Sequence, residues 1–426
     1  MEEEFIIEGQ WWLPDNLANK VSGTLHYKPN QLSDLQLFDD FESRDANFKF
    51  PFYKNASPPI IFGNDVSGNK ITLIVVGYGR VQQNYLSSFS IVHYKIQYLF
   101  KGIHIESIDY KTFNEVEFEF DSLISWVNLY PVALSRLIKD GKLSTDFTLS
   151  YSRSEDNLII DINDGFVLSI IAHAECPEHN VKEIKVKQTY IISIKSSVET
   201  DFYTFLKKCH RFQSFLNIAT FQHNQFQSIK LYSEQHSLGE GNNKFLKTIE
   251  VFFKQSSLEN RADKNSTPSY FFFYDQIQEL FPKILKKWFG FDEKMLPILQ
   301  HLMDSIQKKE AFRSVDFLIV VQALEGFQRR FVDQKPNEEK NLESRLKSLI
   351  YLFSKDIIDL RGIDTKTTVN SRDYYSHFYN KEENMKIIEG RELYKLTSEL
   401  RKLLVCCLLR ELGLDNNKIN LILQSN

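Results

Sequence analysis

The heptapeptide "EVEFEFD", residues 115–121, alternates acidic and apolar side chains with a period of two. This period is typical of a β-strand with one face against a core and the other toward water. We therefore expect Val116, Phe118 and Phe120 to point inward and the glutamates to face solvent. The stretch indicates a sheet covered on one face.

Similar short segments, rich in Val, Ile, Phe, Tyr and Thr and separated by Gly, Asn, Asp and Pro, run from residue 5 to about 195. Residues 201–220 instead carry apolar side chains at helical spacing, after which "QSIKLYS" and "TIEVFF" return to a strand pattern. The pattern predicts an antiparallel β-rich domain, a sandwich or open barrel with a packed helix. Trp11 and Trp12 are expected to pack inward from a strand edge.

Beyond residue 275 the apolar spacing is helical almost throughout, and five or more helices in about 150 residues predict an all-α bundle. The polar segment 254–269 is the best candidate for a linker or long loop. The sequence thus predicts an α+β protein with a β-rich domain at 1–270 and a helical domain at 271–426.

Composition restricts the class of protein. Of 426 residues 25% are charged, and the net charge of -4 excludes the strongly basic balance typical of a dedicated nucleic-acid binder, so such contacts would be local. The acidic start and the lack of an apolar run of ~18 residues lead us to expect a cytoplasmic protein without a membrane segment. The 4 cysteines form neither a disulfide framework nor a convincing metal cluster, so no cofactor or metal is expected.

The stretch "VNSRDYYSHFYN", residues 369–380, places Arg372 five positions before His377. Asn370 or Ser371 is suited to cap a helix, which would set Arg372 in its first turn beside free backbone N–H groups that bind phosphate. Positions five apart on a helix differ by roughly 140° around the axis. We therefore expect Arg372 and His377 to converge only at a bent helix entry or between two copies of the motif.

Neighbouring residues in this stretch each allow two interpretations. Asp373, four before His377, either holds the imidazole or is an acid favoured in a first turn by the helix dipole. The aromatic rings of Tyr374, Tyr375 and Tyr379 either stack on unpaired bases or pack in a core or dimer contact.

A second candidate lies upstream, in "QALEGFQRRF". Glu325 and Arg329 are four apart, so an exposed ion pair along the helix is one interpretation. The other is that Arg329 and Arg330 extend a phosphate-binding face.

The helical half resembles HEPN domains, which carry an Arg-x4-6-His motif. More narrowly, "VVQALEGFQRRF" (320–331) and "VNSRDYYSHFYN" are similar to the HEPN domain of ApeA-type abortive-infection proteins. The β-rich half, with "IEGQWWLPDN", "VSGTLHY", "IIFGNDVSGNKITL" and "LFKGIHIES", is similar to the N-terminal domain that accompanies that HEPN domain. The resemblance covers nearly the whole chain.

The resemblance implies a homodimeric, metal-independent endoribonuclease of antiphage defence, triggered by a phage component that the N-terminal half senses. Arg372 would bind the scissile phosphate, and His377 would exchange protons with the attacking 2′-hydroxyl or the leaving 5′-oxygen. The products would be a 2′,3′-cyclic phosphate and a 5′-hydroxyl, and a structured RNA such as tRNA is one candidate substrate.

Two other classes of function remain open. One is a non-catalytic HEPN dimer that binds RNA or a partner protein, with the motif kept for packing. The other is a carbohydrate- or ligand-binding β domain on a helical scaffold.

Overall fold

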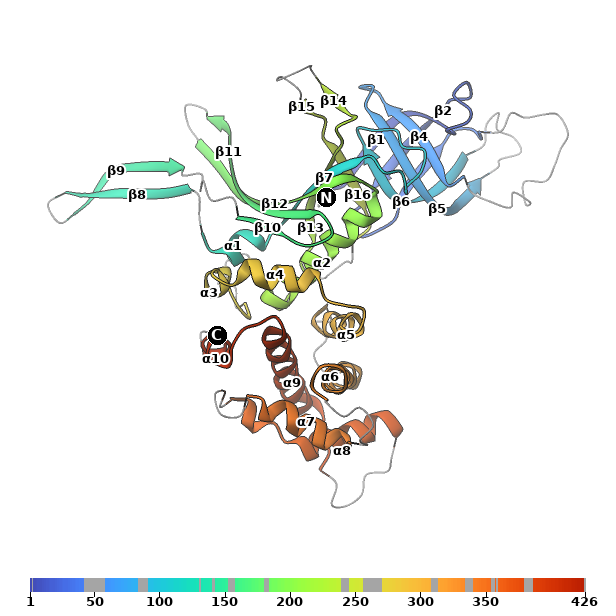
Figure 1. The fold of residues 1–426 in the computed structure, drawn as a ribbon. Coiled ribbons are helices and arrows are strands. Elements are labelled where there is room, and N and C mark those ends of the chain that lie inside the picture. The colour runs from blue at the N-terminus through green and yellow to red at the C-terminus, as the bar shows by residue number, and fades with distance from the viewer. Residues whose placement is uncertain are drawn as a thin grey trace.

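A β-rich region lies above a group of helices in the computed structural model of this chain (Figure 1). The described residues are 1, 3–41, 58–82, 91–129, 132–139, 142–151, 158–179, 184–238, 245–255, 270–307, 313–333, 340–353, 357, 359–378 and 386–424. The α+β class expected from the sequence is confirmed, with antiparallel strands first and helices after.

The main sheet has 12 strands in the order β10-β11-β12-β7-β13-β16-β6-β3-β2-β1-β4-β5. They are β1 (Phe5–Trp12), β2 (Val21–Tyr27), β3 (Ser33–Leu37), β4 (Ile60–Asp65), β5 (Lys70–Gln82), β6 (Ile91–Lys101), β7 (Phe113–Phe120), β10 (Leu158–Asp161), β11 (Phe166–His179), β12 (Ile184–Thr200), β13 (Phe226–Tyr232) and β16 (Ile249–Phe253). Two separate ribbons are β8 (Val132–Lys139) with β9 (Lys142–Tyr151), and β14 (Ser237–Leu238) with β15 (Phe245–Leu246).

Strand β6 closes a barrel. It pairs with β3 through residues 92–96 and also with β5, so the first six strands form a ring in the order β1-β2-β3-β6-β5-β4. The last residues of β6 pair in addition with β16, which continues the sheet beyond the barrel. The sequence predicted a sandwich or an open barrel; the structure has a closed barrel joined to an open sheet.

The inward packing predicted for Trp11 and Trp12 is confirmed, and the two indoles enter different cores. Trp11 is 0% exposed in the barrel interior, where its Nε1 donates to the Gly23 carbonyl over 3.1 Å. Trp12 is 3% exposed in the larger core shared by the open sheet and the helices. Consecutive residues of a strand point to opposite faces, so β1 forms the wall between the cores.

On β7 the three apolar side chains are buried as predicted. Its glutamates lie on the opposite face, but they are half-buried rather than in water. Ser193 Oγ donates to Glu115 over 2.5 Å and the Tyr232 hydroxyl to Glu117 over 2.6 Å. The reason is that β7 lies between β12 and β13, whose polar side chains flank the acids.

Helix α2 (Phe202–Thr220) packs on the open sheet, as its apolar spacing predicted. Its N-cap Asp201 accepts a hydrogen bond from the Thr204 backbone N–H over 2.9 Å. Arg211 of α2 donates to the Trp288 carbonyl and stacks on the Trp288 ring, while Trp288 Nε1 donates back to the Arg211 carbonyl over 2.8 Å. This reciprocal pair links the sheet layer to the helices below.

The remaining helices are α1 (Leu123–Val127), α3 (Tyr274–Ile277), α4 (Phe281–Phe289), α5 (Leu296–Gln307), α6 (Ser314–Phe327), a π-helical turn η3 (Gln328–Val332), α7 (Leu342–Tyr351), the 3-10 turn η4 (Asp359–Gly362), α8 (Thr365–His377), α9 (Gly390–Glu411) and α10 (Asn416–Gln424). Most of the proposed linker, residues 256–269, lies outside the described residues. A division of the chain after residue 270 stays a prediction, because buried side chains of α3 and α4 share one core with the sheet.

Candidate active site

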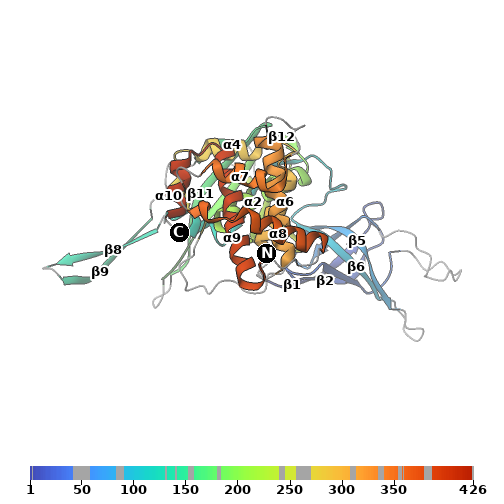
Figure 2. The same cartoon turned by 90° about the horizontal axis from the view of Figure 1, so that it is seen from below.

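Helix α8, which carries the Arg-x4-His motif, lies at the end of the molecule far from the barrel (Figure 1). It lies beside α6 and α7 (Figure 2). It begins at Thr365, because Asp364 caps it by accepting from the Thr367 backbone N–H over 3.1 Å. The hydrogen bond from the Thr367 hydroxyl lowers the pKa of Asp364. The prediction that Asn370 or Ser371 starts the helix was therefore wrong, and Arg372 lies in the helix interior.

Arg372 and His377 meet within one chain. Arg372 Nη1 lies 3.3 Å from His377 Nε2, although a straight helix was expected to turn the two side chains apart. That expectation was wrong for two reasons. The arginine side chain is long enough to extend along the helix, and His377 is the last helical residue, so its ring is not confined to the flank of a following turn.

Two carboxylates hold the Arg372 guanidinium. Asp373 Oδ1 accepts from Nη1 over 2.8 Å, and Glu325 Oε2 of α6 lies 4.0 Å from Nη2. The side chains of Arg372, Asp373 and Glu325 are 27%, 29% and 18% exposed, so the cluster lies at the surface and most of each side chain is shielded from solvent. Such a guanidinium has donors left for a planar anion such as phosphate.

Glu325 also binds Arg329, which places a second guanidinium beside the motif. Arg329 Nη2 donates to Glu325 Oε1 over 2.7 Å, so the predicted ion pair along the helix is present. Arg330 is turned elsewhere and donates to the Lys294 carbonyl before α5 over 2.5 Å. Arg329 therefore shares Glu325 with Arg372, whereas Arg330 does not take part in this cluster. The shared contact through Glu325 is the feature that sequence reasoning missed, since the i,i+4 spacing pointed only to Arg329.

The π-helical turn that carries Arg329 is anchored from α7. The buried guanidinium of Arg345 donates to the Gln328 side chain over 2.5 Å, and its Nη1 lies 3.3 Å from Asp333 Oδ2. The Asp333 backbone N–H closes the turn on the Gln328 carbonyl over 2.8 Å. Single π-helical turns of this type are frequent at functional sites.

Among the predicted aromatic contacts, Tyr375 is engaged within the chain. Its hydroxyl donates to the Ile388 carbonyl over 3.0 Å, and its ring lies edge-on to Phe317. Burial raises the pKa of Tyr375, which keeps this donor protonated. The Ile388 backbone N–H in turn donates to Ser371 Oγ over 3.2 Å. Tyr375 and Ser371 of α8 therefore both hold Ile388, which lies just before α9.

Tyr374 lies edge-on to Tyr375, with 5.1 Å between ring centroids, and it is partly exposed. Tyr379 lies outside the described residues. Next to His377 stands Phe378, which is 88% exposed and adopts a left-handed backbone with φ 56° as the helix C-cap. A large apolar side chain in that position is unusual on a free surface.

Residues 6–288, about two thirds of the chain, match the family model for ApeA N-terminal domain 1. The chain belongs to the ApeA family. Residues 318–418, which contain Glu325, Arg329 and the whole of α8, match the Apea-like HEPN model. No curated protein and no solved structure matches the chain.

These two matches give the ApeA chain the domain pair of an abortive-infection protein of the HEPN nuclease type. HEPN domains commonly dimerise and bind RNA. Within the described residues, no group of three or more His, Cys, Asp or Glu is placed to hold a metal ion. No helix among those residues is long and apolar enough to cross a membrane.

Proposed function

We propose that this protein is a metal-independent endoribonuclease of antiphage abortive infection, with Arg372 and His377 as its reacting pair. The observation that carries the proposal is the 3.3 Å approach of Arg372 Nη1 to His377 Nε2 at the exposed end of α8, inside the HEPN match. One of these side chains keeps its charge near neutral pH and the other can exchange a proton.

The contact between the pair also assigns the histidine tautomer. A guanidinium has no acceptor, so the imidazole nitrogen that faces it must accept and carries no proton. When a substrate phosphate takes over the guanidinium, the lone pair of Nε2 is released and can accept the proton of a ribose 2′-hydroxyl. The freed 2′-oxygen attacks phosphorus and the bond to the 5′-oxygen breaks, which leaves a 2′,3′-cyclic phosphate and a 5′-hydroxyl once that oxygen is protonated.

Arg372 is proposed to bind the scissile phosphate and to stabilise its growing charge. Its anchors, Asp373 and Glu325, fix the guanidinium before substrate arrives, which lowers the cost of orienting it. We assign Asp373 the role of a positioning group rather than a first-turn acid, because the helix starts eight residues before it. Arg329 and Tyr374 are the nearest candidates for further RNA contacts, a phosphate and a base respectively.

A homodimer is part of the proposal. Phe378 exposes 88% of its surface one residue after His377, and a second copy of α8 would cover it. Two motifs in one cleft would also supply a second imidazole to protonate the leaving 5′-oxygen. The β-rich half is proposed to sense a phage component, and a structured RNA such as tRNA is the proposed substrate.

The test is cleavage of RNA by purified protein. His377→Ala and Arg372→Ala should fold normally and lose cleavage by at least ~100-fold, because the first removes the proton-transfer group and the second removes the cation that stabilises the growing charge on the phosphate. Cleavage by the wild type should survive EDTA. Lys366→Ala, an exposed change elsewhere on α8, is the matched control. Undiminished cleavage by either motif variant would remove the proposal.

A non-catalytic dimer predicts a different result. His377→Ala or Phe378→Ser would weaken self-association in sedimentation, and no preparation would cut RNA. The exposed Phe378 favours an interface under either account, so cleavage and association have to be measured on the same variants.

A further inference from the structure

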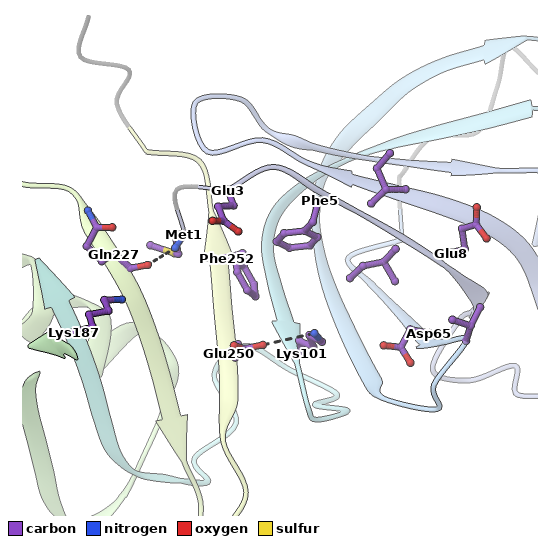
Figure 3. Close-up of a pocket in the computed structure, with 13 residues that line it drawn as sticks. Met1, Glu3, Phe5, Glu8, Asp65, Lys101, Lys187, Gln227, Glu250 and Phe252 are labelled. Carbon is purple, nitrogen blue, oxygen red and sulfur yellow. Dashed lines mark hydrogen bonds and ion pairs between the residues drawn. The ribbon is translucent and has the colours of Figure 1, made fainter. Parts of the chain in front are cut away.

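A groove of about 670 Å³ lies where the barrel meets the open sheet (Figure 3). Its lining comes from the first residues of the chain and β1 on one side, and from β6, β12, β13 and β16 on the other. Ligand sites in proteins commonly have volumes of ~300–1,000 Å³. The groove belongs to the β-rich region, whereas α8, which carries the Arg372–His377 pair, lies at the far end of the helices (Figure 1).

One wall of the groove is a strand edge without a partner. β1 pairs with β2 from Phe5 to Trp11, but with β4 only from Gly9 to Trp12. Within the described residues, the second edge of residues 5–8 therefore has no ladder partner, and all four of these residues line the groove. An open edge offers backbone N–H and C=O groups to another extended chain.

The groove contains an aromatic surface next to that edge. The Phe5 ring lies edge-on to Phe252 of β16 at 4.9 Å and stacks on Tyr27 at 4.8 Å. Ile6 is 61% exposed on the open edge itself. Phe5 and Ile6 point to opposite faces of β1, so each face of the edge offers an apolar contact to the side chains of an added strand.

The charges that line the groove are mainly negative. Glu3, Glu8, Asp65 and Glu250 supply four carboxylates, and the three ammonium groups come from Lys101, Lys187 and the α-amine of Met1, whose pKa is lowered by burial. The Lys101 ammonium lies 3.8 Å from Glu250 and offsets that acid. Glu3 and Glu8 are exposed at the wall formed by β1. This excess of carboxylates attracts a cationic occupant.

We propose that the groove binds an extended basic peptide, which adds as a strand along Phe5–Glu8. Its lysine or arginine side chains would lie among the carboxylates, and its apolar side chains would lie against Phe5 and Phe252. Backbone pairing gives such a complex its affinity, and the alternate side chains give it specificity. The claim concerns binding by the β-rich half and does not depend on the proposed ribonuclease activity.

The test uses the full chain and an eight-residue, end-blocked fluorescent peptide that alternates lysine and valine. Binding is followed by anisotropy at low and at physiological salt. Replacing every lysine of the peptide by glutamate should weaken binding at least about tenfold, because the charge complementarity is lost. Methylating every backbone nitrogen of the lysine–valine peptide should weaken binding by a similar factor, because no N–H is left to pair with β1.

Glu8→Lys should weaken binding of the lysine–valine peptide about tenfold at low salt and less at physiological salt. Glu279→Lys, the same change at an exposed position outside the groove, should leave the dissociation constant within about twofold. The proposal is overturned if the lysine–valine peptide does not bind, or if both variants bind alike. Equal binding of the N-methylated peptide would overturn strand addition in favour of a purely electrostatic site.

Discussion

Replacing Glu325 by glutamine is expected to slow RNA cleavage by roughly 5- to 30-fold without unfolding the protein. The change keeps the shape of the side chain and an acceptor for Arg329, but it removes the charge that faces Arg372. The substitution thus tests whether Glu325 positions Arg372, separately from the ion pair that Glu325 forms with Arg329 on the helix surface.

The magnitude follows from the geometry. At 4.0 Å, opposite charges attract by about 1 kcal/mol in water and about 4 kcal/mol near a protein surface. Arg372 and Glu325 are 27% and 18% exposed, so solvent screening keeps the coupling near the lower end, about 1–2 kcal/mol. The effect on global stability should stay below about 1 kcal/mol, because Arg329 is 59% exposed.

The assay is single-turnover cleavage of a labelled RNA, with thermal unfolding measured on each variant. Arg329→Gln is the comparison, since it releases the other oxygen of Glu325 and leaves the charge beside Arg372 in place; its loss of rate should be smaller. Cleavage by Glu325→Gln as fast as wild type, or faster, would refute the reasoning. The carboxylate would then compete with the substrate phosphate for Arg372.

Two further predictions concern stability. Asp364→Ala should lower the free energy of unfolding by about 1 kcal/mol in denaturant titrations at pH 7, because the cap of α8 is lost. The lowered pKa of Asp364 makes this stabilisation fully present above the usual value of 3.8. It is lost as pH falls through the lower folded-state value, so the stabilities of wild type and variant should converge in acid. A constant difference would contradict the role of the charged cap. Partial desolvation lowers the pKa of His210, so the unfolded chain binds its proton first and stability should fall below pH 6.5. Because much of this side chain is open to solvent, the slope should stay well under the limit of about 1.4 kcal/mol per pH unit for one group. His210→Phe should make that decline shallower, and an unchanged slope would show that other groups cause it.

The sequence predicted features that depend on local periodicity. The alternation in residues 115–121 identified three buried side chains of β7, and the apolar spacing of residues 201–220 identified α2. Closure of the barrel was not predictable in this way. It depends on β6 pairing with β5 along its whole length and with β3 through residues 92–96, and such long-range register leaves no short-range signature.

At the candidate site, the motif residues were visible in the sequence but their geometry was not. Asn370 and Ser371 have good capping side chains, yet the cap is Asp364, and the buried Thr367 and Thr368 pack α8 from its first turns. Tertiary packing thus decided where the helix starts. The contact of Glu325 with Arg372 joins two helices and could only be found from the fold.

The most direct test of the central claim is the chemistry of the RNA ends produced by purified wild-type protein in EDTA, beside His377→Ala. The account predicts a 2′,3′-cyclic phosphate and a 5′-hydroxyl for the wild type, and no product above background for the variant. Ends with a 5′-phosphate and a 3′-hydroxyl, or cleavage that persists in His377→Ala, would contradict the assignment of the Arg372–His377 pair as the reacting groups.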